Sequence, residues 1–387
     1  GDAALFAMET MFMHWSFLPY GIMTIAAVAF GFMYYNAKGS YSVTTQLSPV
    51  LGRFNGEKTS AIVDGIVLFA ITIAIAASLG TMLLSLNYGL EFTTGIESTN
   101  FTMLIITVVL VILYVGSAIL GLKKGMKVLA DWNVYGYAIL LGSLLILGPT
   151  AYLLNLGTEG FVSFLTHIFD RSMVTGAAHD TTWPQSWTTF YWTSYFCWTP
   201  TLGLFLGSIS YGRTIRQTIS VNLLLCGGFG GLWVLIISGT AIERQMHEVV
   251  DLVAVSLKDG MGAIPYEMLE SLPLGMIFAI LYLVIILVSF VTSANANVSV
   301  MAGLATKNIT LEDPTSAPNY QKIIWGVLAA AIAYIIATLI GIGGLKALNN
   351  VAGLVSIFIQ VGIVASVIML ISKWQKYDKT GTYEKTE

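Results

Sequence analysis

Residues 60–85, SAIVDGIVLFAITIAIAASLGTMLLS, decide the fold class, because they form a long apolar run whose one charged side chain is Asp64. A membrane hydrocarbon core of about 30 Å is crossed by about 20 apolar residues in a helix. Backbone groups inside lipid find no water, so such a run has to satisfy its hydrogen bonds internally, as a helix. The stretch therefore predicts a transmembrane helix.

Eight further runs reach the same length, and no alternating ten-residue strands typical of a membrane barrel are visible. The sequence therefore predicts an all-α integral membrane protein with about nine transmembrane helices. Two connecting segments, 156–186 and 240–271, are amphipathic and predict helices lying on the outer interface, and 374–387 predicts a cytoplasmic tail. The predicted spans are 16–36, 60–85, 101–121, 134–155, 187–209, 218–239, 272–294, 322–342 and 348–372.

The composition agrees with lipid as the main solvent. Only 10% of the 387 residues are charged and 56% are hydrophobic, whereas soluble domains carry about 25% charge. The net charge of -3 argues against a nucleic-acid partner, which needs clustered cations. Cys197 and Cys226 both lie in apolar runs, so we expect buried small side chains and no disulfide framework.

The lysines and arginines divide unequally between the two sets of loops, 14 against 4. The richer set belongs in the cytoplasm, which places the N-terminus outside and the C-terminus inside. The first residue is Gly, and no basic n-region or cleavage site follows it, so we expect further spans upstream. The poorer set is Arg171, Arg244, Lys258 and Lys346; the richer set is Lys38, Arg53, Lys58, Lys123, Lys124, Lys127, Arg213, Arg216, Lys307, Lys322, Lys373, Lys376, Lys379 and Lys385.

The stretch 186–200, SWTTFYWTSYFCWTP, is dense in aromatic residues and ends at a helix-disturbing proline. Trp192, Tyr195 and Trp198 recur every third residue and can line one inner face of a helix. Aromatic faces hold a cation by about 0.5–2 kcal/mol each, and a quaternary ammonium has no N–H to donate. The alternative is an interfacial aromatic belt, which explains Trp183 and Trp187 but not the deeper Trp198.

Two shorter groups add candidate ligands. In 14–20, HWSFLPY, Trp15 and Tyr20 can face the same cavity, with an interfacial anchor as the alternative. In 289–295, SFVTSAN, the adjacent hydroxyls of Thr292 and Ser293 suit a sodium ion, which prefers oxygen ligands. Hydrogen bonds between membrane helices are the alternative for these hydroxyls.

Charged groups at the cytoplasmic side have two readings. Arg213 and Arg216 are either positive-inside anchors or members of gating ion pairs. Asp64 is either a functional intramembrane carboxylate or a polar group at a helix end. The four histidines form no haem pair within the spans, and no metal-ligand spacing or phosphate loop is visible. No enzymatic activity and no cofactor beyond a possible sodium ion is therefore expected.

Several motifs, in order along the chain, resemble those of the betaine/choline/carnitine transporter (BCCT) family. The run from Ser186 to Arg216 is similar to its eighth span and following loop, and 7–15, AMETMFMHW, is similar to the start of its fourth span. The other matching stretches are 122–127, LKKGMK, 291–295, VTSAN, and 343–348, GGLKAL.

The resemblance implies a leucine-transporter-like fold of two inverted five-helix repeats, usually assembled as a homotrimer. The nine spans would correspond to the family's spans four to twelve. The third span, with its glycine-rich unwound segment, would lie in an omitted N-terminal segment or on a partner chain, unless the protein is a degenerate relative. The resemblance places Trp192, Tyr195, Trp198, Trp15 and Tyr20 on aromatic-box positions.

The same resemblance places Thr292 and Ser293 on sodium-ligand positions. Sodium-independent members carry basic or Met side chains at ion sites, and span 60–85 has no Lys or Arg, which favours ion coupling through Thr72 and Ser78 as well. Proton coupling and exchange remain alternatives. The family commonly has Trp where this chain has Ser194 and Tyr195, which implies a reshaped cage.

The functional prediction is a secondary active transporter in the bacterial inner membrane. It would carry a cationic or zwitterionic osmolyte (glycine betaine, choline, carnitine or a sulfonium analogue) by alternating access through an aromatic cage. The alternative is a non-transporting or degenerate membrane subunit packed in a larger complex. A membrane enzyme would need a buried acid/base or metal cluster, and the sequence shows none.

Overall fold

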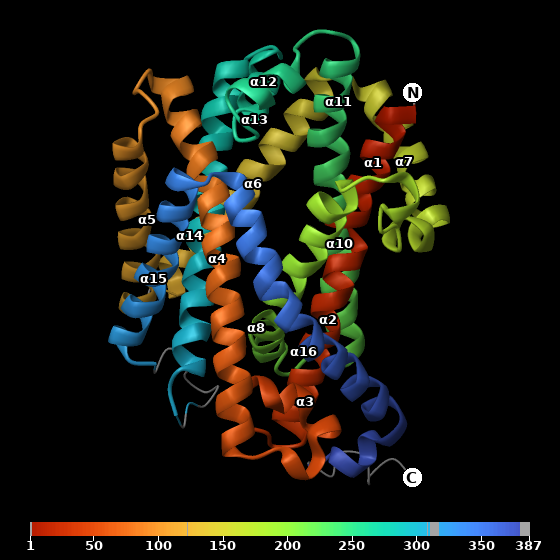
Figure 1. Cartoon of the computed structure of the whole chain (residues 1–387), viewed down its shortest axis with the longest axis vertical. Helices are drawn as coiled ribbons and strands as arrows, with labels where there is room; N and C mark the ends of the chain where they lie inside the picture. The colour runs from red at the N-terminus through yellow and green to blue at the C-terminus, as the bar shows by residue number, and fades with distance from the viewer. Residues whose placement is uncertain (1, 122, 308, 310–316, 380–387) are drawn as a thin grey trace.

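The computed structural model describes residues 2–121, 123–307, 309 and 317–379, and within these ranges the chain is helical with no strand (Figure 1). The all-α prediction is therefore confirmed for this part of the chain. Leu122 of the 122–127 motif and the predicted tail beyond residue 379, including Lys385, lie outside the described residues.

Eight helical stretches in the described ranges are long and apolar enough to cross a membrane, one fewer than predicted. The difference is α8 (Phe190–Ile209), which forms as a helix where span 187–209 was expected. Its Trp, Tyr, Thr and Ser residues keep its hydropathy below that of these eight stretches. The eight stretches are Asp2–Asn36, Glu57–Thr94, Asn100–Leu120, Gly125–Leu147, Ile215–Met246, Gly275–Leu304, Asn319–Leu339 and Ile342–Tyr377.

One expected span is divided in two by a Gly-Pro pair. The expected span 134–155 is divided at Gly148–Pro149, because proline lacks the N–H that would continue the first helix. The two resulting helices are α6 (Lys123–Leu147) and α7 (Thr150–Ser172). The expected interfacial segment 156–186 thus begins inside α7.

The stretch Ile215–Met246 is one continuous helical run in which π-helical turns alternate with α-helix. Its parts are α9 (Ile215–Ile219), η5 (Ser220–Cys226), α10 (Gly227–Trp233), η6 (Val234–Ser238) and α11 (Gly239–Met246). Two short helices follow, α12 (Leu252–Lys258) and α13 (Ile264–Glu270), where an interfacial segment was expected. They lie with α11 at the end of the bundle opposite the C-terminus (Figure 1).

A group of long helices packs around α4 (Glu57–Thr94). Apolar side chains such as Leu83, Leu110 and Tyr114 fill the interior between them. The long helices that contact α4 are α8, α5 (Asn100–Leu120), α14 (Gly275–Leu304), α15 (Asn319–Leu339) and α16 (Ile342–Tyr377). Beside α4, the short helix α3 (Val43–Leu51) has Ser42 as its N-cap, and Asp64 Oδ1 of α4 accepts from the Val43 N–H at 2.8 Å. Asp64 therefore satisfies one of the free N–H groups at the start of α3.

Helix α8 lies at the centre, against α16 and α2 (Phe17–Gly31) (Figure 1). The approach to α16 is close because Gly353 has no side chain: a Cβ there would lie 2.2 Å from Cβ of Thr193. Beside it, Thr193 Oγ1 donates to Asn350 Oδ1 at 2.7 Å. Small residues allow membrane helices to approach in this way.

The contact at Gly353 gives a stability prediction. Gly353→Ala forces α8 and α16 apart, and overpacking of this kind costs about 1–3 kcal/mol. We expect a lower thermal unfolding temperature in detergent micelles. Gly343→Ala is the matched control on the same helix, because a Cβ there would meet no atom within 4 Å. Equal unfolding temperatures for the two variants would contradict the close approach.

Candidate functional site

The helix that opens the described chain breaks at Ser16. Helix α1 (Asp2–Trp15) ends there, and Ser16 has φ −102° and ψ −122°, outside the helical region, before α2 begins. The Ser16 hydroxyl donates to the Phe12 carbonyl, and the Tyr195 hydroxyl of α8 donates to the His14 carbonyl. A break in a membrane helix frees backbone groups, and the Tyr195 hydroxyl satisfies one of them, the His14 carbonyl. The Phe12 carbonyl also accepts from the Ser16 N–H at 3.0 Å.

Seven aromatic rings gather around this break. Trp15 meets Tyr191 at 5.4 Å between centroids and Tyr195 at 6.3 Å, both edge to face, the arrangement that ring quadrupoles favour. Trp192 lies 6.1 Å from Tyr195. Trp187, Tyr191 and Tyr195 form a stacked ladder along η4 (Gln185–Thr189) and α8, with steps of 6.1 and 6.3 Å. The aromatic cluster, as named here, is His14, Trp15, Trp187, Phe190, Tyr191, Trp192 and Tyr195.

The aromatic cluster is buried on one side and open on another. Tyr195 is 7% exposed, whereas Trp15 is 41% exposed. The cluster contains no carboxylate. A cation does reach its edge: the Lys346 ammonium lies 4.7 Å from the Trp187 centroid and 5.2 Å from that of Phe190. These ring faces are therefore accessible to a positive charge.

The structure brings together three of the five aromatic residues singled out in the sequence, Trp15, Trp192 and Tyr195. Trp198 packs instead against a separate apolar cluster that includes Ile71 and Ala352. The reason is helical geometry, because six residues rotate a side chain by about 240°, away from the face of Trp192. Tyr20 makes no ring contact with the described residues of the cluster, but its ring and the Trp15 carbonyl both lie against Gly230 of α10, 3.2 and 2.3 Å from the position of a Cβ there.

Sequence reasoning overlooked Tyr191 and His14. The ladder of Trp187, Tyr191 and Tyr195 at every fourth residue is a helical signal that was available in the sequence. His14 carried no such signal, because its ring stacks on Tyr191 at 4.6 Å across two helices. A long-range contact of this kind requires the fold.

Two of the four candidate ion ligands line one cavity. Thr292 and Ser293 line a cavity of about 250 Å³ together with Leu202 and Phe205 of α8. The Thr292 hydroxyl lies 2.9 Å from the Ser289 carbonyl of its own helix. Elsewhere, Thr72 is buried and donates to the Leu68 carbonyl at 2.6 Å, and Ser78 is exposed.

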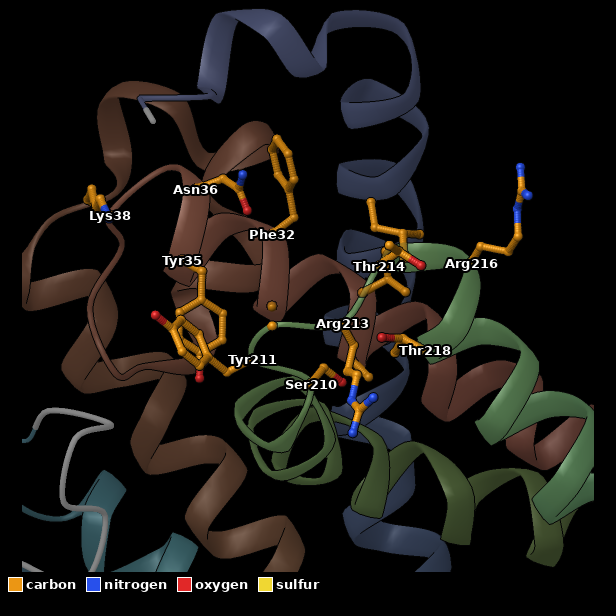
Figure 2. Close-up of a pocket in the computed structure, with 15 residues that line it drawn as sticks. Phe32, Tyr35, Asn36, Lys38, Ser210, Tyr211, Arg213, Thr214, Arg216 and Thr218 are labelled. Carbon is orange, nitrogen blue, oxygen red and sulfur yellow. The ribbon is translucent and has the colours of Figure 1, made fainter. Parts of the chain in front are cut away.

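Arg213 and Arg216 line a larger cavity of about 780 Å³ between α2, η1 (Phe32–Asn36) and the loop that follows α8 (Figure 2). The two guanidinium groups point in different directions, and among the described residues neither forms an ion pair. Tyr35 and Tyr211 lie side by side at 4.9 Å. The expected gating ion pairs are therefore not made within the described part of the chain.

A buried carboxylate that the sequence did not single out joins α1 to α7. Glu9 has 3% of its side chain exposed and accepts from Arg171 Nε at 3.0 Å and from Ser163 Oγ at 3.0 Å. The Arg171 guanidinium also lies 4.9 Å from the Phe6 ring centroid. Both carboxylate oxygens are paired, which makes the burial of this charge tolerable.

The hydroxyl of Tyr195 gives a second prediction. Tyr195→Phe leaves the His14 carbonyl unpaired at the helix break, and an unsatisfied buried acceptor costs about 1–3 kcal/mol. We expect a lower unfolding temperature in detergent. Tyr135→Phe, at a ring on α6 that is 63% exposed, should leave it unchanged. Equal stability of the Tyr195→Phe variant and the parent would show that the hydroxyl does not support the break.

Comparison with known proteins matches residues 1–379 to the BCCT, betaine/carnitine/choline family transporter. Glycine betaine transporter OpuD of Bacillus subtilis (strain 168) is 29% identical over 376 residues, which cover 96% of this chain and 70% of the relative. The ectoine/hydroxyectoine transporter of Virgibacillus pantothenticus is 26% identical over 375 residues, 97% of this chain and 73% of the relative. The chain thus belongs to the betaine/carnitine/choline transporter family, a family of multi-pass membrane transporters of small molecules.

Proposed function

We propose that this protein is a secondary transporter that binds a quaternary-ammonium or related osmolyte in the aromatic cluster. The single observation that carries the proposal is the meeting of Trp15, Tyr191, Trp192 and Tyr195 at the Ser16 break. A fully methylated cation carries a permanent charge but has no N–H to donate to a carboxylate. Ring faces attract such a charge without hydrogen bonds, and the aromatic cluster offers ring faces and no carboxylate.

The binding free energy expected from several rings is adequate for a transport substrate. Each partly desolvated ring contributes about 0.5–2 kcal/mol to holding a cation, so three or four rings contribute about 1.5–8 kcal/mol, and the upper half of this range corresponds to millimolar to micromolar affinity. Weak binding of this order lets a carrier release its substrate. The contact of Lys346 with Trp187 supports the choice of a cation, because the same cluster already accepts an ammonium at its edge.

The relatives narrow the substrate to compatible solutes. Relatives named for a substrate include glycine betaine transporters and an ectoine/hydroxyectoine transporter, and glycine betaine and ectoine are zwitterions. Glycine betaine, choline, carnitine and sulfonium analogues all present a cation without N–H donors, and the ring cluster suits any of them. We therefore assign the substrate to the class of osmolytes that carry a cation without N–H donors.

Transport would proceed by alternating access, with the helix break as the place where the site rearranges. At Ser16 the helix is not continuous, and the hydroxyls of Ser16 and Tyr195 donate to backbone carbonyls there. Sodium is the proposed coupling ion, with Thr292 and Ser293 as candidate ligands. We place the C-terminus in the cytoplasm of a bacterial inner membrane, following the distribution of lysine and arginine. The proposed homotrimer follows from membership of the family.

Substitution in the ring cluster tests the proposal. Trp192→Ala should weaken glycine betaine binding about tenfold, because one well-placed ring contributes up to about 2 kcal/mol. Binding is measured by calorimetry on the protein in lipid nanodiscs. Trp132→Ala removes a Trp that is 70% exposed on α6 and serves as the matched control. Equal losses, or no binding by the parent protein, would favour a non-transporting membrane subunit.

Sodium dependence tests the coupling proposal separately. The double substitution of Thr292→Ala and Ser293→Ala should raise the sodium concentration needed for half-maximal betaine binding by about tenfold, because two oxygen ligands are lost. Thr338→Ala is the control, since its hydroxyl makes the same kind of bond, to the Tyr334 carbonyl at 2.8 Å, on a different helix. Binding that does not respond to sodium in the parent would select proton coupling or exchange.

A further inference from the structure

His14 is a buried polar side chain without a partner. The residue is 0% exposed, and neither ring nitrogen makes a hydrogen bond to any residue that the structure describes. A buried donor or acceptor left unpaired costs about 1–3 kcal/mol, so each such group in a native protein calls for a reason. A purely apolar ring of the same size would avoid this cost.

The ring of His14 is held in place by the aromatic cluster. It stacks on Tyr191 at 4.6 Å with an interplanar angle of 26°, and it meets Trp192 at 5.7 Å edge to face. Its backbone carbonyl accepts from Tyr195. Two rings of α8 therefore hold the imidazole, and a third residue, Tyr195, holds its backbone. The two ring nitrogens have no hydrogen-bond partner among the described residues.

Other charged groups near the cluster are already engaged. Glu9, on the same helix, is paired with Arg171 and Ser163. The ammonium of Lys346 lies on Trp187 and Phe190 at the far edge, and it is 3.4 Å from the Ser186 carbonyl, to which it donates. Among the described residues of the cluster, His14 thus offers two buried ring nitrogens without a hydrogen-bond partner, beside the Trp192 and Tyr191 rings.

We propose that the His14 imidazole donates an N–H to the carboxylate of a zwitterionic osmolyte whose ammonium rests on the neighbouring rings. This assignment rests on the proposed function and extends it from the cation to the anionic end of the substrate. A cation is held within about 6 Å of a ring centroid. The imidazole is in direct contact with the rings of Tyr191 and Trp192 and is fully buried. A zwitterion whose ammonium rests on these rings therefore places its carboxylate beside the imidazole once the cluster opens to admit it.

The proposal makes His14 a specificity-determining residue. A carboxylate accepts a charge-assisted hydrogen bond, which is about twice as strong as a neutral one. Choline carries the same trimethylammonium group with a hydroxyl in place of the carboxylate. Loss of the imidazole should therefore weaken zwitterion binding and spare choline binding, whereas loss of a ring should weaken both.

The test compares glycine betaine and choline by calorimetry on the protein in lipid nanodiscs. His14→Phe keeps the stacked ring and removes both nitrogens, and we expect it to weaken betaine about tenfold or more and choline by less than about twofold. His14→Gln restores an N–H donor and should recover most of the betaine affinity. Trp192→Ala should weaken both ligands.

Several results would overturn the assignment. These are an equal loss of both ligands in His14→Phe, no loss of either, or a selective loss of betaine in Lys346→Met in place of His14→Phe. Binding of neither ligand by the parent protein would instead refute the proposed function itself.

A second measurement uses the unaltered protein, in case His14→Phe does not fold. In ¹⁵N-histidine spectra, the histidine signal that a soluble paramagnetic reagent leaves sharp belongs to the buried ring. Glycine betaine should shift this signal and choline should not. Identical spectra with the two ligands would count against the proposal.

Discussion

The break at Ser16 and its attachment to α8 through Tyr195 determine the arrangement of the candidate site. In an uninterrupted helix, the His14 carbonyl would accept from a backbone N–H one turn further on and would not be free for Tyr195. The break instead holds His14 and Trp15 against Tyr191, and the Tyr195 hydroxyl satisfies the His14 carbonyl there. The close approach of α8 to α2 and α16, which Gly207 and Gly353 permit, keeps that hydroxyl within reach.

Much of the fold followed from the sequence because lipid leaves few choices. A run such as 60–85 can satisfy its backbone in a membrane only as a helix, and the structure has α4 there. The effects of single residues within the predicted spans were harder to predict. Hydropathy alone did not show that Pro149 would divide one expected span, and the aromatic and hydroxyl residues of α8 lowered its hydropathy although it lies at the centre of the bundle.

The candidate site was predictable where its signal was local. Trp15, Trp192 and Tyr195 were recognised from aromatic density, and they do meet. A spacing of three residues suggested that Trp198 would join them, but a helix of 3.6 residues per turn carries it to another face. His14 could not be recognised, because its significance comes from the burial of both nitrogens across a contact between distant segments.

The position of Lys346 has a consequence for competition. Its ammonium is tethered to α16 and lies on Trp187, so it occupies that ring at a very high effective concentration. Any free cation that approaches the same face has to displace an occupant that cannot diffuse away. The described residues place such a tethered cation on Trp187 and Phe190 at the outer end of the ring ladder, and none on Tyr191 or Tyr195.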